Sequence, residues 1–267
     1  MNYYAVLLRI EALGDEKLRV SLELVPRNAD ELSAELRLVK NRFPSINTIN
    51  LPDLARFELR SWEAAGLSKA SYGASIPHIR AMDFKADEPF ALIDVLDRHA
   101  ITEVLVVTGD APGDGRLPAG GATCTGLIAK LKREHPQLKV YAAIDPYRDS
   151  MRGEYEYVRR KIDAGADGFF TQPFFDSRLM ELYADMLEGT DIFWGVAPVV
   201  TDKSRGYWEK RNRVVFPNHF EPTLAWNLDF SRQAIEFARQ RKGHIYFMPI
   251  KVDLTAYLEG VFNEVTV

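Results

Sequence analysis

The sequence predicts an α/β fold, a single-domain (β/α)8 TIM barrel spanning residues 1–267, and three observations lead to it. Short β-rich runs alternate with amphipathic helical stretches along the chain. Such alternation implies parallel strand pairing, because parallel neighbours need a crossover connection. Eight of these units in 267 residues match the size of this barrel. A doubly wound open sheet ranks second, because no Gly-x-Gly-x-x-Gly pattern follows the first strand.

The strands and helices are predicted from composition and spacing. Runs rich in β-branched and aromatic residues are the predicted strands, at 19–24, 46–50, 75–80, 103–108, 138–143, 167–171, 191–197 and 244–249. Apolar residues at i, i+3, i+4 and i+7 predict helices at 29–42, 89–100, 126–135, 154–165, 177–189 and 228–243. Residues 4–13 predict a short lead-in helix. The long segment 198–243 predicts an extra loop or helix over the barrel mouth before the last strand.

Composition excludes several classes of function. The net charge is −4 and no dense Lys/Arg run occurs, which argues against a nucleic-acid binder. One cysteine, Cys124, leaves no disulfide within the chain and no Cys-based zinc site. No HExxH, GxSxG or His/Asp cluster supports hydrolysis by a metal or a nucleophilic serine. The N-terminus has no basic leader and lacks the length of a membrane span, so we expect a cytoplasmic protein.

Active sites of such barrels lie at the carboxyl ends of the strands, which makes the end of the first predicted strand informative. Alternation puts Ser21 and Glu23 on one face and Val20, Leu22 and Leu24 on the other, apolar face toward the helices. The Glu23 carboxyl then points into the barrel, where loss of hydration raises its pKa and favours a general acid. The alternative is an ion pair with a barrel Arg or Lys, since structural pairs also perturb pKa values.

The fourth predicted strand ends in Thr108, Gly109 and Asp110. Glycine permits a close approach of backbone to a ligand, and the Asp110 carboxylate could bind paired ligand donors. The alternative is a simple turn or helix cap, for which Gly-Asp is common. The glycine-rich loop that follows lacks the lysine of a phosphate-binding P-loop.

The sixth predicted strand ends in the most distinctive stretch, DGFFTQPFFD. Pro173 cannot donate to the strand ladder, so the strand stops and the Gln172 amide stands at its end. That amide offers both a donor and an acceptor, which suits a heterocycle displaying both, although it could also cap barrel backbone. Phe174 and Phe175 are predicted to be core residues rather than ligand stackers.

Other polar residues, each considered alone, are explained by structural roles. His78 follows a proline near the end of the third strand, and a lone histidine is usually a hydrogen-bonded structural residue. Arg160 and Lys161 end a helix, where cations complement the dipole. His244 begins the eighth strand and so lies at the end that serves stability, whereas Lys251 follows that strand at the functional end.

Taken together, these segments resemble the methylenetetrahydrofolate reductase family. The resemblance covers roughly residues 19–260, is most specific over 160–176, and rests on SLELVPR, PHIR, VVTGDAP, YAAIDP, RRKIDAGADGFFTQPFFD, WGVAPV and HIYFMPIK in the family's order. It implies a barrel that reduces 5,10-methylenetetrahydrofolate to 5-methyltetrahydrofolate with NADH or NADPH. It also implies FAD lying across the strand ends.

The resemblance assigns roles residue by residue. Glu23 matches the general acid that helps protonate N10, so that the imidazolidine ring opens to an N5 iminium. Asp110 matches the carboxylate that binds the pterin and influences the flavin. Gln172 matches an amide that contacts folate, and Lys251 stands where the family has a substrate-side arginine. Cofactor contacts are implied at His78, Thr108, Gly109, Ala143, Arg160 and Lys161.

Several positions depart from the family pattern, mostly on the flavin side. Thr108 replaces an arginine, Tyr157 replaces an asparagine, NTINLPD replaces a Thr-Tyr-Gly segment, and a loop tyrosine is absent near Thr123 and Cys124. Lys251 replaces an arginine, and a lysine lacks the planar guanidinium that can donate two parallel hydrogen bonds. The folate chemistry is therefore better preserved than the flavin cradle. A flavin-independent enzyme with direct hydride transfer from NADH is an open alternative.

Two further alternatives come from other classes. A non-catalytic subunit could bind folate or a partner enzyme, but binding alone does not need a buried acid such as Glu23. A barrel lyase or aldolase would need a Schiff-base lysine inside a strand or a metal cluster, and neither is evident. We expect a homo-oligomer in one-carbon metabolism that binds folate and a nicotinamide dinucleotide, and neither nucleic acid nor membrane.

Overall fold

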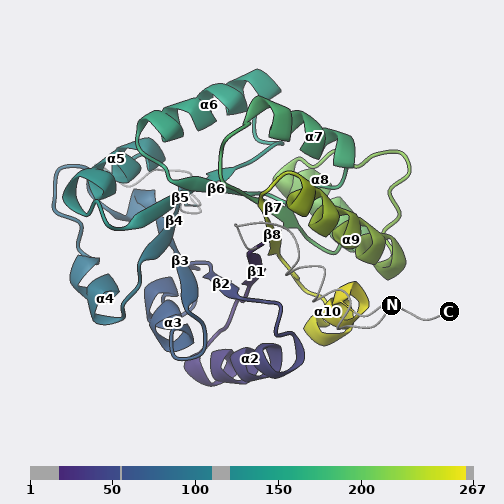
Figure 1. The fold of residues 1–267 in the computed structure, drawn as a ribbon, viewed down its shortest axis with the longest axis horizontal. Coiled ribbons are helices and arrows are strands. Elements are labelled where there is room, and N and C mark those ends of the chain that lie inside the picture. The colour runs from purple at the N-terminus through teal and green to yellow at the C-terminus, as the bar shows by residue number, and fades with distance from the viewer. Residues whose placement is uncertain (1–17, 55, 110–120, 263–267) are drawn as a thin grey trace.

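The computed structural model describes residues 18–54, 56–109 and 121–262 and has eight parallel strands closed into a barrel (Figure 1). Each strand pairs with the next in the sequence, and the last pairs with the first. The strands are β1 (Val20–Glu23), β2 (Thr48–Leu51), β3 (Ala74–Arg80), β4 (Glu103–Val107), β5 (Lys139–Ile144), β6 (Gly168–Thr171), β7 (Ile192–Val196) and β8 (His244–Phe247). The predicted barrel is confirmed, and each predicted strand overlaps an observed one.

Helices form the outer ring of the barrel (Figure 1). They are α2 (Ala29–Arg42), α3 (Ser61–Ser68), η1 (Ala81–Asp83), α4 (Ile93–Arg98), α5 (Cys124–Glu134), α6 (Met151–Asp163), α7 (Ser177–Met186), α8 (Asp202–Asn212), α9 (Leu224–Gln240) and α10 (Leu254–Phe262). The six predicted helices are found, with α4 shorter than predicted. Helices α3 and α10 were not predicted by residue range, and the predicted helix at 4–13 lies outside the described residues.

Side-chain caps start several helices directly after the loops that follow the strands. The Asn28 side chain accepts a hydrogen bond from the backbone of Glu31 at 2.9 Å at the start of α2. Ser150 caps α6 and Asp176 caps α7 in the same way. Such caps satisfy backbone N–H groups that have no partner within the helix. They set where each helix begins and so how long each loop at the carboxyl end of the barrel can be.

Two apolar layers follow from the alternation of side chains along the strands. One layer, which includes Leu22, Ile49 and Val140, packs between the strands and the helices. The other fills the barrel interior, where the Phe170 and Phe193 rings stack with centroids 4.0 Å apart. The barrel is therefore a packed core and not a pore, and a ligand must bind at one of its ends.

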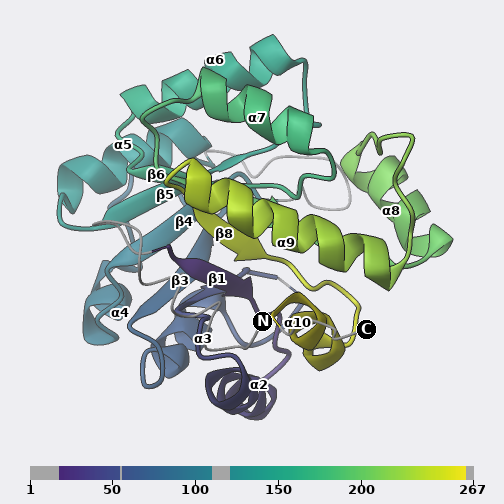
Figure 2. The same cartoon turned by 45° about the vertical axis from the view of Figure 1, so that its right-hand side comes forward.

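The extra segment after β7 contains α8, so of the loop or helix predicted within 198–243 a helix is found, and its predicted place over the barrel mouth stays a prediction. Figure 2 shows α8 set apart from the other helices, beside one end of α9. Its Trp208 side chain meets Phe175 with ring centroids 5.9 Å apart, and Phe175 belongs to the interior cluster. The interior core thus continues out of the barrel and fixes the extra helix.

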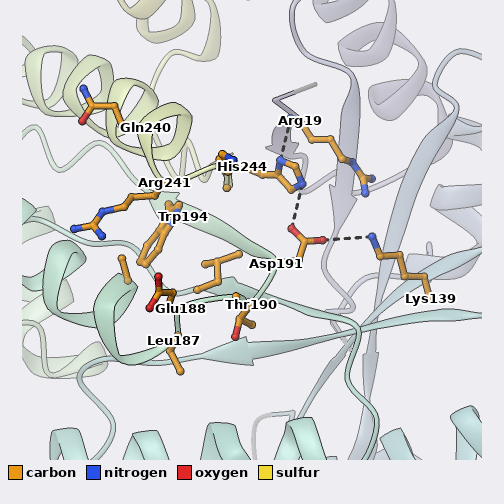
Figure 3. A pocket seen from close by; sticks show the side chains of 15 residues that line it. Arg19, Lys139, Leu187, Glu188, Thr190, Asp191, Trp194, Gln240, Arg241 and His244 are labelled. Atoms are coloured by element: carbon orange, nitrogen blue, oxygen red, sulfur yellow. Dashed lines mark hydrogen bonds and ion pairs between the residues drawn. The ribbon is translucent and has the colours of Figure 1, made fainter. Parts of the chain in front are cut away.

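A polar network lies at the amino-terminal end of the barrel, around a cavity of about 960 Å³ (Figure 3). The Asp191 carboxylate accepts a hydrogen bond from His244 Nε2 at 3.1 Å and lies 3.4 Å from Lys139 Nζ. The backbone N–H of Arg19 donates to His244 Nδ1 at 3.2 Å. The predicted place of His244 at this end agrees with the structure, and both of its ring nitrogens are used in structural bonds.

The Arg19 side chain forms further bonds at the same end of the barrel, on the side of the interior core. Its guanidinium donates to the Tyr141 hydroxyl at 2.8 Å and pairs with Glu103 at 2.8 Å. Tyr141 is fully buried, so the cation is held at the floor of the interior core. These bonds join β1 to β4 and β5 across the barrel. They are a means of stabilising the closed barrel.

We expect Asp191→Asn to lower the free energy of unfolding by about 1–3 kcal/mol near neutral pH, because it weakens a hydrogen-bonded charge pair. Burial alone would raise the pKa of Asp191, but His244 and Lys139 outweigh it and hold that pKa below its usual value. A lowered carboxyl pKa contributes stability above the pKa of the unfolded chain, and that stability is lost as pH falls through the folded pKa. Urea unfolding at neutral and acidic pH measures the difference between variant and wild type.

The matched control is Asp185→Asn, which removes a carboxylate from an exposed ion pair with Arg241. Exposed pairs contribute roughly 0–1 kcal/mol, so this variant should stay close to wild type at all pH values. Equal effects of the two substitutions would contradict the structural role of the Asp191 network.

Candidate functional site

A second cavity, of about 750 Å³, opens at the carboxyl ends of β2 to β6, the end at which such barrels carry their chemistry. Its volume is in the range of ligand pockets. The larger cavity at the other end is a poorer candidate, because its central groups are already bonded to one another. Six of the predicted site residues line the smaller cavity: His78, Thr108, Gly109, Ala143, Lys161 and Gln172.

Four cationic side chains also face this cavity, namely Arg56, Arg80, Arg148 and Lys161. Two of the carboxylates in the wall are already committed to arginines. Asp53 accepts from Arg60 Nε at 2.9 Å, and Glu154 accepts from Arg148 Nε at 3.1 Å. Arg148 is offset by Glu154, and the Arg80 guanidinium lies 3.5 Å from the Asp83 carboxylate. Asp145 adds a further carboxylate, so the positive excess of the wall depends on Arg56 and Lys161. Such an excess suits a ligand that carries phosphates.

Lys161 is the most unusual of these cations, because it is only 3% exposed. Its ammonium group donates to the backbone carbonyl of Ala143 and lies 3.9 Å from the centroid of the Tyr157 ring. Burial lowers the pKa of Lys161 to about 8. A lysine held on apolar and aromatic surface, with no carboxylate paired to it among the described residues, is available to an anionic ligand.

Tyr157 lines the cavity, and three cationic side chains lie over its ring. Arg148 lies 4.4 Å and Arg160 5.3 Å from its centroid, in addition to Lys161. Such cation–π contacts stabilise both partners modestly. Arg160 is exposed and does not line the cavity. Its contact with a residue of the cavity wall is with the Tyr157 ring.

His78 is both hydrogen-bonded and part of the cavity wall. Its Nε2 lies 3.1 Å from Asn50 Oδ1, and Asn50 Nδ2 donates to Ser21 Oγ at 2.7 Å. Because Asn50 uses its amide group as a donor elsewhere, its oxygen accepts and His78 Nε2 carries the hydrogen. Burial lowers the pKa of His78 to about 3, against a smaller opposing effect of Asp53. The ring is therefore neutral, and its Nδ1 is a hydrogen-bond acceptor.

Gly109 occupies a position that requires glycine. Its φ is +91°, and a Cβ atom there would lie 2.6 Å from the sulfur of Met82. Packing against Met82 therefore accounts for the glycine, and the predicted close approach of its backbone to a ligand stays a prediction. Asp110 lies outside the described residues, so its predicted role stays a prediction.

Glu23 ends β1 and faces the barrel interior, where its Oε2 accepts a hydrogen bond from the Tyr246 hydroxyl of β8. Burial raises the pKa of Glu23 to about 7, and the bond from Tyr246 opposes that shift. No described cation forms an ion pair with Glu23, which removes the alternative weighed from the sequence as far as the described residues extend. The residue as a whole is intermediate in exposure, and it lies at the carboxyl end of β1 without lining the cavity itself.

Gln172 follows β6, and its backbone N–H donates to the carbonyl of Ile144 at 2.7 Å. Its side chain lines the cavity and has no hydrogen-bond partner among the described residues. Phe174 and Phe175, which follow it, are 0% and 1% exposed and belong to the core as expected. The chain therefore anchors this segment by its backbone and its phenylalanines and leaves the amide to the cavity.

Lys251 does not line the cavity. It follows β8 in a left-handed backbone conformation with φ of +57°, and its Nζ lies 5.2 Å from the centroid of the Tyr207 ring on α8. This contact connects the loop after the last strand to the extra helix. Its predicted contact with substrate stays a prediction.

Sequence reasoning did not single out several residues that shape the cavity. Arg56, Arg80, Asp145 and Arg148 all lie in or next to the loops that follow strands, and so does the acidic Asp53. Their position relative to the strand ends was the available signal. What it could not supply is which of them pair with one another, such as Arg148 with Glu154 at the start of α6.

The described residues meet the requirements of neither a metal site nor a membrane-spanning helix. Among residues 18–54, 56–109 and 121–262, no group of three or more His, Cys, Asp or Glu side chains could hold a metal ion. Within that same part of the chain, every helix is too short or too polar to cross a membrane.

Comparison with known sequences identifies one family. A family model described as methylenetetrahydrofolate reductase matches residues 17–235. A 5,10-methylenetetrahydrofolate reductase from Salmonella typhimurium is 25% identical over 158 residues, which cover 57% of this chain and 53% of that protein. The Escherichia coli protein of the same name is 25% identical over 146 residues, with coverage of 53% and 49%. The chain spans about half the length of the curated relatives it matches.

Comparison with solved structures identifies the barrel. An uncharacterized protein from Clostridium thermocellum, described as binding two copies of 5-methyl-5,6,7,8-tetrahydrofolic acid, aligns with a TM-score of 0.58, 13% identity and coverage of 98% and 96%. An oxaloacetate acetylhydrolase aligns with a TM-score of 0.56, 12% identity and coverage of 90% and 78%. At these identities the matches show the fold alone.

We expect Lys161→Met to weaken the binding of a dinucleotide such as NADH by about 10- to 100-fold, because a buried cation in the wall is lost. Arg159→Met is the control, since Arg159 is an exposed neighbour on the same helix and does not line the cavity. Calorimetric titration of both variants with NADH gives the comparison. Equal dissociation constants for the two variants would show that Lys161 does not bind the dinucleotide.

Proposed function

Because the chain belongs to the methylenetetrahydrofolate reductase family, we propose that it reduces 5,10-methylenetetrahydrofolate to 5-methyltetrahydrofolate with a hydride from NADH or NADPH. The observation that carries the proposal is the Glu23 carboxyl, held inside the barrel at its functional end with a pKa of about 7. A binding protein has no need of such an acid. The Clostridium thermocellum barrel, described as binding 5-methyltetrahydrofolic acid, supports a fold that can hold the product.

Glu23 supplies the proton that makes the substrate electrophilic. The protonated carboxyl gives its proton to N10 while the bond between N10 and the methylene carbon breaks, and the electron pair of that bond stays on N10. The methylene carbon is left as an iminium on N5, and Glu23 becomes a carboxylate. Hydride addition to that carbon gives the methyl group. An acid with a pKa near the working pH is suited to this step.

Gln172 and Asp110 are proposed to hold the pterin. The Gln172 amide has a donor and an acceptor that no described residue uses, so it can bond a pterin edge that displays both. Asp110 would add a carboxylate that binds paired N–H donors and stabilises the developing cation. Lys251 would contact the substrate from the loop after β8.

The cationic wall fits a dinucleotide cofactor. Lysine and arginine side chains suit its phosphates, and Nδ1 of neutral His78, which has no partner among the described residues, suits a hydroxyl donor. We assign FAD to this cavity, where it would carry the hydride between nicotinamide and folate. The residues proposed to hold it are His78, Thr108, Gly109, Ala143 and Lys161 in the cavity wall, and Arg160, which lies outside the wall against the Tyr157 ring.

A flavin-independent reaction is the second candidate, and Tyr157 favours it. Its ring occupies the cavity wall and already engages Lys161 and Arg148, which reduces the surface left for a flavin. The roles of Glu23, Asp110 and Gln172 are the same in both cases. In the flavin-independent reaction, NADH would give its hydride directly to the iminium carbon.

The purified protein tests both candidates. Oxidation of NADH that depends on methylenetetrahydrofolate is the expected result, and its absence with either nicotinamide dinucleotide would refute the reductase. A visible spectrum then decides on the cofactor. Flavin absorbance supports FAD, whereas turnover without flavin bands and unchanged by added FAD supports direct transfer.

We expect Glu23→Gln to lower turnover by roughly 10²- to 10⁴-fold, the usual contribution of a general acid, while the fold and NADH binding stay intact. In the wild type the rate should fall as pH rises through about 7, because the acid must be protonated to act. Steady-state rates from pH 5.5 to 9 measure both effects.

Glu35→Gln is the control for this variant. Glu35 lies on α2, away from the cavity, and burial raises its pKa to about 7 as well. It should keep the wild-type rate and pH profile. A loss of turnover in both variants would show that carboxyl burial matters for stability and not for proton transfer.

We expect Gln172→Glu to weaken folate binding by about tenfold or more, because it replaces an amide donor by an acceptor facing the pterin. The dissociation constant of NADH should change much less. Separate titrations with tetrahydrofolate and NADH make the comparison. Equal losses for both ligands would contradict the placement of Gln172 on the folate side.

A further inference from the structure

Tyr246 is a buried tyrosine whose hydroxyl bonds to the acid Glu23. It lies in β8, which closes the barrel against β1, and its backbone is in register with Ser21. The ring is 3% exposed and meets the Phe170 ring edge-on, with centroids 5.1 Å apart. The tyrosine is therefore fixed by the interior core before any ligand binds.

The hydrogen bond has one direction that the surroundings favour. Burial and the neighbouring Glu23 raise the pKa of Tyr246 well above its usual value, so the phenol keeps its proton. No other acceptor for this proton is found among the described residues. The hydroxyl therefore donates to Glu23 Oε2, and that oxygen serves as an acceptor.

This direction decides where the transferable proton of Glu23 resides. A protonated carboxyl carries its hydrogen on one oxygen, and the other oxygen remains an acceptor. Because Oε2 already accepts from Tyr246, the acidic proton is placed on Oε1. Oε1 has no partner among the described residues, so it is free to face a substrate at the barrel mouth.

We propose that Tyr246 is a positioning residue for the acid, which fixes the Glu23 carboxyl so that Oε1 presents the proton to the substrate. The inference rests on the proposed reductase function for its catalytic meaning. After the proton leaves, the same hydroxyl donates to the new carboxylate, and hydrogen bonds to charged groups are stronger than those to neutral ones. Tyr246 thus holds the acid before proton transfer and stabilises its conjugate base afterwards.

Few groups other than Tyr246 affect the pKa of Glu23. Among the described residues, burial and the Tyr246 hydroxyl are the causes that shift the pKa of Glu23, and no charged side chain of the neighbouring strands contributes. Changing the hydroxyl alone should therefore move the titration of Glu23 in a defined direction. The donor favours the charged form, so its loss raises the carboxyl pKa further.

Tyr246→Phe tests the proposal with the ring packing retained. We expect kcat for folate reduction to fall by about 10- to 100-fold at low pH, where the acid is protonated in both proteins, with NADH binding unchanged. The pH at which the rate falls should move upward, because the acid stays protonated to higher pH. A lower melting temperature with an unmoved pH profile would overturn the proposal, because a purely structural role predicts that result.

Tyr141→Phe is the matched control. Tyr141 also faces the interior core, but its hydroxyl accepts from Arg19 at the opposite end of the barrel. This variant can lose stability, yet its rate should fall at the same pH as in wild type. An upward shift of equal size in Tyr141→Phe would also refute the specific action of Tyr246.

Infrared titration of the carboxyl band separates this inference from the proposed reaction. The band assigned to Glu23 by its absence in Glu23→Gln should titrate at higher pH in Tyr246→Phe than in wild type. If wild type does not reduce methylenetetrahydrofolate but the band shifts, the reductase proposal fails and the coupling of Tyr246 to Glu23 stands. If the band does not shift, the coupling itself fails, whatever the enzyme does.

Discussion

The pairing of β1 with β8 is the constraint on which the rest of the molecule depends. It closes the sheet, and closure forces every second side chain of each strand into a common interior. The aromatic residues there exclude water from the space below the mouth. A carboxyl at the end of β1 then has protein on most sides, which is why burial raises the pKa of Glu23. The same pairing brings Tyr246, which follows Glu23 by 223 residues in the chain, within hydrogen-bond distance.

Both ends of the barrel contain paired charges, but they differ in one buried cation. At the amino-terminal end the charged groups bond to one another, with Asp191 between His244 and Lys139 and the Arg19 side chain on Glu103. At the carboxyl end Lys161 is buried without a paired carboxylate among the described residues. Removing one partner of a buried charge pair is destabilising, whereas a buried cation without a paired carboxylate is available to an anionic ligand. This difference, together with the position at the carboxyl ends of the strands, favours the smaller cavity as the ligand site.

The barrel could be predicted because its strands are short apolar runs separated by helical periodicity, a signal that is local in sequence. The inward direction of Glu23 followed from the two-residue repeat of β1 for the same reason. Helix α3 was missed because Ser61, Gly66 and Ser68 dilute its apolar spacing. Tyr246 was missed because its role exists only through a contact across barrel closure. Pairings such as Arg148 with Glu154 depend on loop geometry, which residue types alone do not determine.

The separation of charges within the carboxyl end has a chemical reason. An acid that must be protonated near neutral pH cannot lie beside an arginine or lysine, because a nearby cation lowers a carboxyl pKa. The cations of the cavity wall come from the loops after β2 and β5, from the end of β3 and from α6, whereas Glu23 stands on β1 beside the neutral Tyr246. Proton transfer to a neutral substrate creates a carboxylate and an iminium together. The anion formed on Glu23 then offsets the cation formed on the substrate, and the hydroxyl of Tyr246 stabilises that anion without cancelling its charge.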